Sequence, residues 1–311
     1  MPAVSVIVPI FNVEKYIERC VRRLMGQALR DLEYIFVDDC TPDKSMEILE
    51  RVLDEYPERR SQVKIIHNEV NRGSAFTRRV GIEHATGDYI IHCDSDDYPE
   101  PDMYGKMYAK ASEENLDIVI CRTCNVYPDH VVLAPDKLGL DDLLGALLRQ
   151  DMYNHLTDKL ITRQAYLKGI TYPRCDMSED TAILIQLVAN CKTFGYIYEP
   201  LYNYVASEGG ISRNGFTEDK VRQMVENYNL AFSALEAKGL AGKYRKDITN
   251  LKCWLKSALQ EFPREFYMSI YPEVDLALLF NRRFPILCRI GHLTKLLGIH
   301  GLSKLFKKNK Q

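Results

Sequence analysis

Strand and helix patterns alternate over residues 1–112 of this chain, and few fold classes are compatible with that alternation. Short β-branched runs such as residues 4–8 are typical of buried parallel strands. The segment that follows places Ile17, Val21 and Leu24 at helical spacing. Because strands joined by helical crossovers pair in parallel with right-handed connections, we predict an α/β domain with a mostly parallel, Rossmann-like sheet sandwiched by helices.

The same patterns divide the chain into three parts. Further strands are predicted at 34–37, 63–66, 89–93, 117–124, 159–161 and 201–205, and further helices at 44–56, 74–85, 102–112, 141–149 and 179–189. After residue 216 the pattern is helical, with segments at 218–238, 242–261 and 265–280. We therefore expect an α/β domain over 1–215, a helical extension over 216–281 and a separate tail over 282–311.

The tail differs from the rest of the chain in its charge. The formal net charge is −2, so no general basic field favours nucleic acid. Residues 282–311 nevertheless carry eight Lys and Arg residues and no acidic residue, which leaves −10 on residues 1–281. Apolar residues at helical spacing within the tail, interrupted at Gly298 and Gly301, predict amphipathic helices that contact a membrane surface peripherally without crossing it. The alternative, a C-terminal helix packed on the body, stays open.

The cysteines and the N-terminus indicate a reducing compartment. Nine cysteines form an odd set, and the first residues lack the basic and apolar regions of a signal peptide. We expect reduced thiols and a cytoplasmic protein, at the inner face of the cell membrane if the tail binds lipid. Cys121 and Cys124 form a C-x-x-C within a predicted strand, where their side chains would point to opposite faces and hold no zinc.

Polar groups follow four predicted strands, at Asn12, Asp38-Asp39, Asn71-Arg72-Gly73 and Asp94-Ser95-Asp96-Asp97. Ligands of open α/β sheets bind beyond the carboxyl ends of the strands. Carboxylates gathered there would repel each other unless a cation or donor groups balanced them. Asp94 and Asp96, at spacing two in a tight turn, are suited to one Mg²⁺ or Mn²⁺ that also binds phosphate and water. The alternative is an acidic turn that precedes a helix.

Together these segments resemble glycosyltransferase family 2, whose members have the GT-A fold and of which many build bacterial cell-surface polysaccharides. The resemblance covers about residues 1–212 and rests on the order and spacing of its motifs rather than on any one of them. The matching segments are 4–12, 37–39 with Asp43, 71–73 through Arg78 to 81–82, 87–97, 158–160, 178–181 and 201–204. Cys40-Thr41-Pro42 departs from the usual Gly-Ser-Thr of the family, and Arg79 replaces its common Asn.

The resemblance implies a role for each matching residue. The nucleobase of a sugar nucleotide would donate a ring N–H to Asp39, and Arg72 would lie beside it. Asp94 would face the ribose. Asp96 would ligate the metal that bridges the diphosphate. Asp180, preceded by Glu179, stands where the family keeps its catalytic base. The implied nucleotide-sugar-binding residues are Pro9, Phe11, Asn12, Glu14, Asp39, Arg72, Asp94 and Ser95.

A reaction follows from these implied roles. Domain 1–215 would move a hexosyl or N-acetylhexosaminyl group from a nucleoside-diphosphate donor, a UDP-sugar, to a hydroxyl of a glycan or lipid-linked acceptor. A single base, Asp180, and no covalent intermediate imply inversion at the anomeric carbon. The reading depends on Asp39, Asp96 and Asp180 lining one cleft.

Other interpretations stay open. Ser178-Glu179-Asp180 can be a helix cap without any catalysis. The chain can also be a non-catalytic sugar-nucleotide-binding or membrane-docked partner protein, or a nucleotidyltransferase, although the first strand is not followed by the glycine-rich loop that nucleotidyl transfer usually needs.

Some side chains allow two interpretations. We expect His92 to be a packed neighbour of the acidic cluster rather than a ligand. Ser212 and Arg213 would form a loop that closes over the diphosphate, or an exposed turn. Four tyrosines either stack on an acceptor sugar or belong to the core: Tyr153, Tyr172, Tyr202 and Tyr204.

Overall fold

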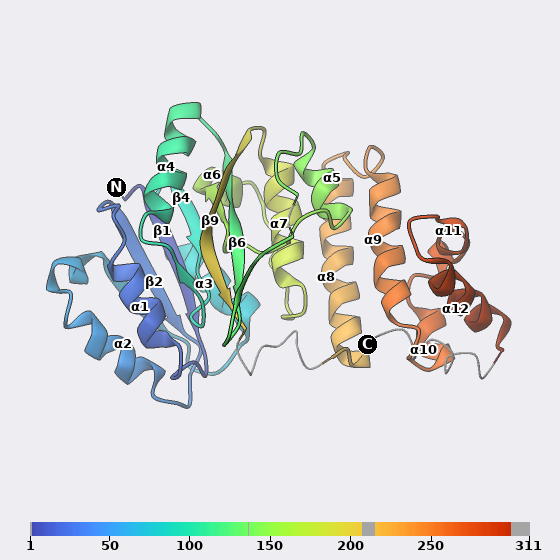
Figure 1. Ribbon diagram of the computed structural model, residues 1–311, viewed down its shortest axis with the longest axis horizontal. Helices are drawn as coiled ribbons and strands as arrows, with labels where there is room; N and C mark the ends of the chain where they lie inside the picture. Colours follow the sequence, from blue (N-terminus) through green and yellow to red (C-terminus); the bar gives the residue numbers. More distant parts are fainter. Residues whose placement is uncertain (1, 136, 207–214, 300–311) are drawn as a thin grey trace.

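The computed structural model describes residues 2–135, 137–206 and 215–299. Figure 1 shows a twisted sheet on one side of the molecule and a row of helices on the other. The nine strands are ordered β3-β2-β1-β4-β8-β6-β9-β5, with β7 beside β6. The strands are β1 Val4–Ile10, β2 Leu32–Asp38, β3 Val63–His67, β4 Tyr89–His92, β5 Tyr98–Pro99, β6 Ile118–Val126, β7 Val131–Leu133, β8 Lys159–Thr162 and β9 Phe194–Val205.

Helices cover the sheet and continue beyond it (Figure 1). Those of the first two thirds are α1 Ile17–Met25, α2 Ser45–Leu53, α3 Ser74–His84, α4 Met103–Glu114, α5 Leu143–Leu148, α6 Arg163–Leu167 and α7 Glu179–Asn190, with a 3₁₀ turn η1 at Pro57–Gln62. The rest are α8 Glu218–Ala237, α9 Arg245–Ala258, α10 Arg264–Ser269, η2 Pro272–Val274, α11 Asp275–Phe280 and α12 Ile286–Leu297.

The predicted α/β sheet is confirmed. Strands β1 to β4 pair in parallel, and the β-branched strand β1 is almost wholly buried between β2 and β4. Beyond β4 the sheet is mixed, because β8 runs antiparallel to both β4 and β6 while β6 and β9 are parallel. In the register of the parallel half, Ile10 lies beside Asp38 and Asp38 beside His67. The segments that follow these strands therefore emerge along one edge of the sheet.

The helices after residue 216 share a core with the sheet. One continuous cluster of buried apolar side chains includes Ile7 and Ile35 of the strands together with Leu251 and Leu278 of the C-terminal helices. Helix α8 packs along α7 and so joins the two regions. The division into parts at residues 215 and 281 stays a prediction.

The C-terminal region departs from one prediction and agrees with another. The single helix predicted at 265–280 is wrong: α10 and α11 are separate, because Pro272 restricts the residue before it and Tyr271 has a φ of 43°. In the tail, α12 ends at Gly298, whose φ is 69°, and its internal Gly291 is buried. A Cβ on Gly291 would lie 2.2 Å from Oε1 of Gln260, so close packing accounts for that glycine. Gly301 lies outside the described residues.

Two further absences hold for the described ranges. No helix in residues 2–135, 137–206 or 215–299 is long and apolar enough to cross a membrane. Cys121 is buried and Cys124 half-buried on β6, and no group of three or more His, Cys, Asp or Glu side chains in these ranges forms a metal cluster. All nine cysteines are free thiols.

Candidate active site

Asp39, at the end of β2, holds the loop that leads into α3. Its Oδ1 accepts hydrogen bonds from Nδ2 of Asn68 at 2.8 Å and from the backbone N–H of Arg72 at 2.9 Å. Its Oδ2 accepts the N–H of Gly73 at 2.8 Å. Because the carboxylate is buried and has three donors, it ties β2 to residues 68–73. Arg72 itself extends outward, with its guanidinium 3.9 Å from the ring centre of Phe76.

The loops after β1 and β2 are fastened to each other. The N–H of Asn12, a residue with a φ of 55°, donates to Oγ1 of Thr41 at 2.8 Å. The N–H of Glu14 donates to Oδ2 of Asp43 at 2.9 Å. Phe11, Asn12 and Glu14 are all exposed, so their side chains are accessible at the edge of the sheet, while Pro9 is half-buried.

Cys40 explains one departure from the family pattern. Its φ of 57° places it in the left-handed region, which glycine adopts without the strain that a side chain brings. The loop therefore keeps a glycine-like backbone although the residue has changed.

The turn after β4 is held from beneath by β9. The hydroxyl of Tyr202 accepts the N–H of Asp94 at 3.1 Å and donates to Oδ2 of Asp97 at 2.8 Å, while the N–H of Val205 donates to Oδ1 of Asp97 at 2.7 Å. Burial, together with the charges of Asp96 and Asp94, raises the pKa of Asp97. Asp97 is thus the structural carboxyl group of the turn, and the half-buried Asp94 and Asp96 lie nearer to solvent.

Arg78 joins this turn to the start of α7. Its Nη2 lies 2.7 Å from Oδ1 of Asp94, and its Nε lies 3.4 Å from Oδ1 of Asp180 and 3.7 Å from Oε1 of Glu179. The side chain is only 5% exposed. Burial opposes its charge, but the charges of Asp94 and Asp180 raise the pKa of Arg78 and keep it cationic. Residues from β4, α3 and α7 therefore form one charged cluster.

The two carboxyl groups of α7 differ in their surroundings. Burial and the charge of Asp180 raise the pKa of Glu179 to about 8, and Oε1 of Glu179 accepts a hydrogen bond from Oγ of Ser74 at 2.8 Å. Burial also raises the pKa of Asp180, against the opposing charge of Arg78. At neutral pH we therefore assign a proton to Glu179 and a carboxylate to Asp180.

Asp176 caps α3 from a distant loop, and nothing in the sequence pattern marked it. Its Oδ1 accepts the N–H of Ala75 at 3.0 Å and lies 3.2 Å from Oγ of Ser74. A Cβ on Gly73, whose φ is 82°, would lie 2.3 Å from Oδ2 of Asp176. Ser178, the expected cap of α7, has a φ of 64° and makes no side-chain cap hydrogen bond.

An aromatic group lies next to Asp180. The rings of Tyr153 and His155 stack with centres 5.0 Å apart, and His155 lies 5.5 Å from Tyr204. The backbone N–H of Leu156 hydrogen bonds to Asp180. Since Tyr153, His155 and Tyr204 are half-buried, part of each ring remains accessible.

The loop that carries these rings is supported by a buried cation. Nζ of Lys159 donates to the carbonyl oxygens of Tyr153 and His155 at 3.0 and 2.9 Å and pairs with Asp158 at 2.6 Å. Both charged side chains are almost completely buried. Of the other two tyrosines, Tyr202 is buried in the core, and Tyr172 is half-buried and lies beside Arg79.

Three further predictions concern residues near the cluster. His92 is fully buried and lies 3.4 Å from the hydroxyl of Tyr166, and burial lowers its pKa, so the interpretation as a packed neighbour is confirmed. Ser95 is buried within the turn after β4. Ser212 and Arg213 lie outside the described residues.

The residues present fit a divalent metal that is held mainly by phosphate. A protein cage is absent from the described ranges, as noted above. Magnesium and manganese bound with a diphosphate need only one or two protein carboxylates. Oδ1 of Asp94 is paired with Arg78, and Asp96, two residues further along the same turn, is the carboxylate that the family resemblance assigns to such a metal.

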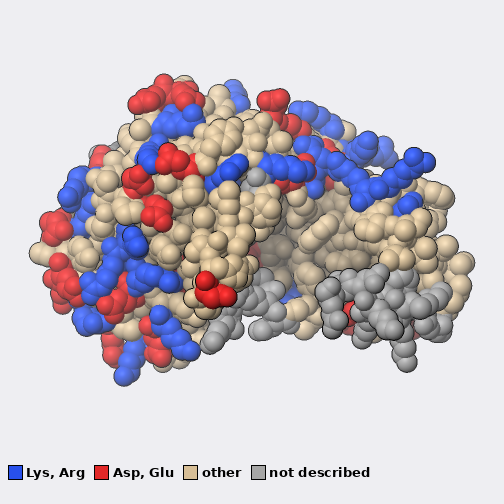
Figure 2. All heavy atoms as spheres, in the orientation of Figure 1, with Lys and Arg blue, Asp and Glu red and all other residues tan. Residues whose placement is uncertain are grey.

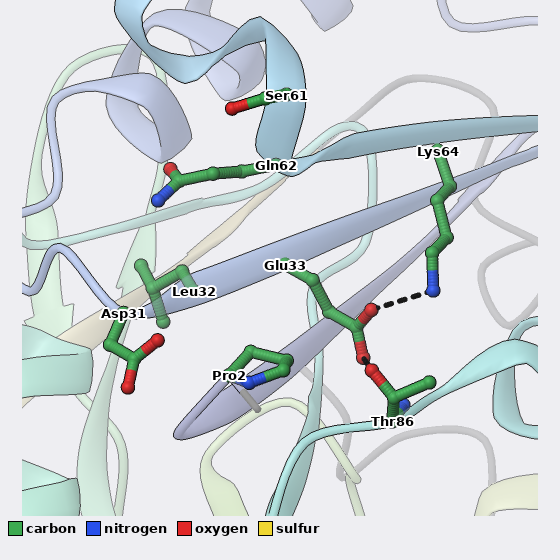
Figure 3. Close-up of a pocket in the computed structure, with 8 residues that line it drawn as sticks. All are labelled: Pro2, Asp31, Leu32, Glu33, Ser61, Gln62, Lys64 and Thr86. Atoms are coloured by element: carbon green, nitrogen blue, oxygen red, sulfur yellow. Dashed lines mark hydrogen bonds and ion pairs between the residues drawn. The ribbon is translucent and has the colours of Figure 1, made fainter.

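A cavity at the opposite edge of the sheet does not compete with this site. It has a volume of about 400 Å³ and lies at the amino ends of β1 and β2 (Figure 3). Its one buried carboxylate, Glu33, accepts from Nζ of Lys64 at 2.8 Å and from the hydroxyls of Ser5 and Thr86 at 2.5 and 3.0 Å. Because these donors occupy Glu33, the group serves the sheet rather than a reaction.

The comparisons with known proteins agree with the geometry at the carboxyl edge. The family model described as glycosyl transferase family 2 matches residues 5–166, which is more than half of the chain. The chain belongs to glycosyltransferase family 2. The match covers the turn after β4 and the Asp158-Lys159 pair but ends before Asp180.

Similar proteins and similar structures align with most of the chain. The Bacillus subtilis protein named uncharacterized glycosyltransferase EpsJ is 27% identical over 265 residues, which cover 81% of this chain and 75% of the relative. Among solved structures, S. aureus TarS in complex with UDP-GlcNAc has a TM-score of 0.67 at 18% identity, with 98% of this chain and 92% of TarS covered. The mannosyltransferase PcManGT from Pyrobaculum calidifontis, in complex with GDP-Man and Mn²⁺, has a TM-score of 0.55 at 16% identity, over 99% and 88% of the two chains.

These findings establish the family 2 protein as a glycosyltransferase with the GT-A fold, as the motifs predicted. The nucleotidyltransferase and the non-catalytic partner protein are therefore set aside. Sequence reasoning missed the part of Arg78 as the link between β4 and α7. One signal was available: Arg78 stands on the helical stripe of Ala75 and Ile82, where a charged residue is rare unless it is paired.

Proposed function

We propose that this glycosyltransferase transfers a sugar from a UDP-sugar to a hydroxyl group with inversion of configuration. The observation that carries the proposal is the contact of Arg78 with both Asp94 and Asp180, because it sets the turn for the diphosphate beside the catalytic base. TarS in complex with UDP-GlcNAc, of the same fold, supports a nucleotide-sugar donor.

The donor would bind along the carboxyl edge of β1, β2 and β4. In the proposal, the nucleobase of the donor lies between Phe11 and Arg72. Pro9, Asn12 and Glu14 surround it. The carboxylate of Asp39 already has three protein donors, but each carboxylate oxygen has two lone pairs, so Oδ2 can accept a ring N–H as well. Asp94 faces the ribose, and Ser95 shapes the turn from within.

The donor diphosphate needs positive charge beside it. Asp96 would hold a Mg²⁺ or Mn²⁺ ion together with phosphate oxygens, and such an ion stabilises the charge that a leaving diphosphate develops. The protein itself contributes Arg78, whose cation faces the same turn. PcManGT, solved with GDP-Man and Mn²⁺, supports the choice of metal.

The acceptor hydroxyl would lose its proton to Asp180. A base is most effective when its pKa approaches the working pH, and burial raises the pKa of Asp180 in that direction. Glu179, with a pKa of about 8, holds a proton and so adds no second charge beside the base. A single carboxylate that acts as base and forms no covalent intermediate produces inversion. The rings of Tyr153, His155 and Tyr204 lie where an acceptor sugar would approach.

We also propose where the reaction takes place. The acceptor is a glycan or a lipid-linked sugar of a bacterial surface polysaccharide, made at the cytoplasmic face of the membrane, which residues 282–311 contact. This part of the proposal rests on the family and on the basic tail.

The test measures two quantities with a panel of UDP- and GDP-sugars, in Mn²⁺ or with a chelator: the melting temperature of the protein, and nucleotide release when simple glycosides are added as acceptors. We expect one donor to raise the melting temperature only when metal is present, because a ligand of the native state adds to its stability. We expect Asp96→Ala to lose this metal-dependent shift. An unchanged shift in Asp96→Ala would overturn the metal assignment, and retention of the donor's anomeric configuration in the product would overturn the proposed mechanism.

A further inference from the structure

The exposed apolar side chains of the described residues concentrate near the end of the chain. Residues 276–299 include eight large apolar side chains that are between 37% and 73% exposed. A soluble surface rarely groups so many of them without a binding role. They are Leu276, Phe280, Ile286, Leu287, Ile290, Leu293, Leu297 and Ile299.

Helix α12 presents four of these residues as one row. Ile286, Ile290, Leu293 and Leu297 recur at four- and three-residue intervals, which places them on one face of the helix. The opposite face is anchored, because Nδ1 of the buried His292 lies 2.7 Å from the hydroxyl of Tyr267. The exposed row is therefore the outer side of a packed helix.

Helix α11 extends the same surface. Leu276 and Phe280, one helical turn apart, are the two most exposed large apolar side chains of the described residues, while Leu278 between them is buried. Helices α11 and α12 pack against each other at the end of the molecule remote from β1 to β3 (Figure 1). In Figure 2 the right-hand end of the molecule shows mostly uncharged atoms where described residues form the surface, and basic side chains lie along the upper edge. We name the exposed apolar side chains of α11 and α12 the apolar face.

The stretch of chain that carries the apolar face has charges of one sign. From residue 276 to residue 311 the chain has eight Lys and Arg residues and no Asp or Glu. Arg282 and Arg283 are exposed in the connection between α11 and α12. The nearest preceding acidic groups are already paired, Glu273 with Lys252 at 2.7 Å and Asp275 with Lys256 at 2.5 Å. A second copy of the chain would bring these basic residues together, whereas an anionic lipid surface would neutralise them.

We propose that the apolar face docks the enzyme on an anionic phospholipid bilayer, with the α12 row among the acyl chains and Arg282 and Arg283 at the headgroups. Amphipathic helices with basic residues beside an apolar face bind membrane surfaces in this way. The inference deepens the proposed membrane contact of residues 282–311 and is independent of the donor chemistry. It assigns the contact to α11 and α12, including Leu276 and Phe280 outside the basic tail, rather than to the charges of the tail alone.

The test is sedimentation of the full chain with vesicles of phosphatidylcholine, with and without phosphatidylglycerol. We expect wild type to bind only the anionic vesicles and the variant Ile286→Ser/Ile290→Ser/Leu297→Ser to bind them about tenfold less or weaker still, because apolar burial supplies much of such binding. The control Val131→Ser/Leu133→Ser/Leu167→Ser changes equally exposed residues elsewhere and should bind like wild type. Donor turnover with a soluble acceptor, measured in parallel, should be unchanged in both variants.

A second measurement reports insertion directly. The chain has one tryptophan, Trp254, so Leu293→Trp in a Trp254→Phe background places a single reporter on the apolar face. We expect brominated phosphatidylglycerol to quench it, but not a reporter at Val132. Equal sedimentation of wild type and the α12 variant would overturn the proposal. A wild-type dimer that the α12 substitutions dissociate would also overturn it, because the apolar face would then bind a second copy. Vesicle binding that appears only after deletion of residues 300–311 would overturn it as well, because the tail would then occupy the face.

Discussion

Nε of Arg78 lies 3.4 Å from Oδ1 of Asp180, and within the described residues neither buried atom has a hydrogen-bond partner. The two groups attract each other as an ion pair but leave a donor and an acceptor unsatisfied. Such atoms cost about 1–3 kcal/mol each when buried, so a ligand that satisfies them gains affinity. This pair is therefore the point at which we expect substrate binding and catalysis to meet.

Replacing Asp180 should separate catalysis from binding. Asp180→Asn keeps the size and shape of the side chain but removes the carboxylate that would act as the base. We therefore expect kcat to fall about 10²–10⁴-fold. Donor affinity, measured by calorimetry with Mn²⁺, should stay close to that of wild type. A loss of affinity as large as the loss of kcat would show that Asp180 serves donor binding instead.

Replacing Arg78 should destabilise the fold. Arg78→Met leaves the carboxylates of Asp94 and Asp180 without their cation, and a buried charge that loses its partner typically costs about 3–5 kcal/mol. Denaturant unfolding measures this cost. The neighbouring Arg79→Met is the control: its ion pair with Glu83 is half-exposed, and we expect a loss below about 1 kcal/mol. Adding Asp94→Asn to Arg78→Met should recover part of the stability, and no recovery would count against the charge argument.

The proton on Glu179 should make stability depend on pH. Its pKa rises from 4.5 to about 8 on folding, so the folded protein holds this proton more tightly than the unfolded chain. The stabilisation is complete below about pH 4.5 and is lost as the pH rises through about 8. We expect the free energy of unfolding of wild type to fall across this range relative to that of Glu179→Gln. Parallel pH profiles of the two proteins would contradict the assignment.

Lys159 should position the aromatic loop. Lys159→Met removes a buried cation that holds the carbonyl groups of Tyr153 and His155, and we expect it to lose about 3–5 kcal/mol of stability. Where the variant folds at low temperature, its KM for acceptor should rise more than its KM for donor. The control Lys106→Met breaks an exposed pair with Asp102 and should change neither KM value and hardly alter the stability.

Gly73 should resist substitution for two reasons. Gly73→Ala forces a side chain into a backbone conformation, φ 82° and ψ 169°, that is confined almost to glycine, and it also sets the new Cβ against Oδ2 of Asp176. In the comparison variant Gly239→Ala, φ is 70° and nothing lies within 4 Å of the new Cβ, so the loss should be about 1 kcal/mol. We expect a clearly larger loss for Gly73→Ala in denaturant unfolding, together with weaker donor binding. Equal losses would mean that the contact with Asp176 is unimportant.

Local patterns were sufficient for most of the secondary structure. Ile17, Val21 and Leu24 are buried on α1 as their spacing predicted, and β1 lies where its β-branched run indicated. The prediction of one helix over 265–280 was wrong because the hydrophobic periodicity continues across Pro272, whereas the backbone at Tyr271 does not stay helical. The tail, by contrast, forms α12 up to Gly298, as the glycine there indicated.

Periodicity and motif spacing are properties of neighbouring residues, and they were enough to predict the mostly parallel sheet, the family and the carboxyl-edge segments that carry Asp39 and Asp96. The position of Arg78 between Asp94 and Asp180, and the cap that Asp176 provides for α3, are visible only in the folded chain. Those contacts join elements far apart in the chain, and their strength depends on burial and on which charges share it. Neither burial nor charge pairing is a local property, so spacing alone could not reveal them.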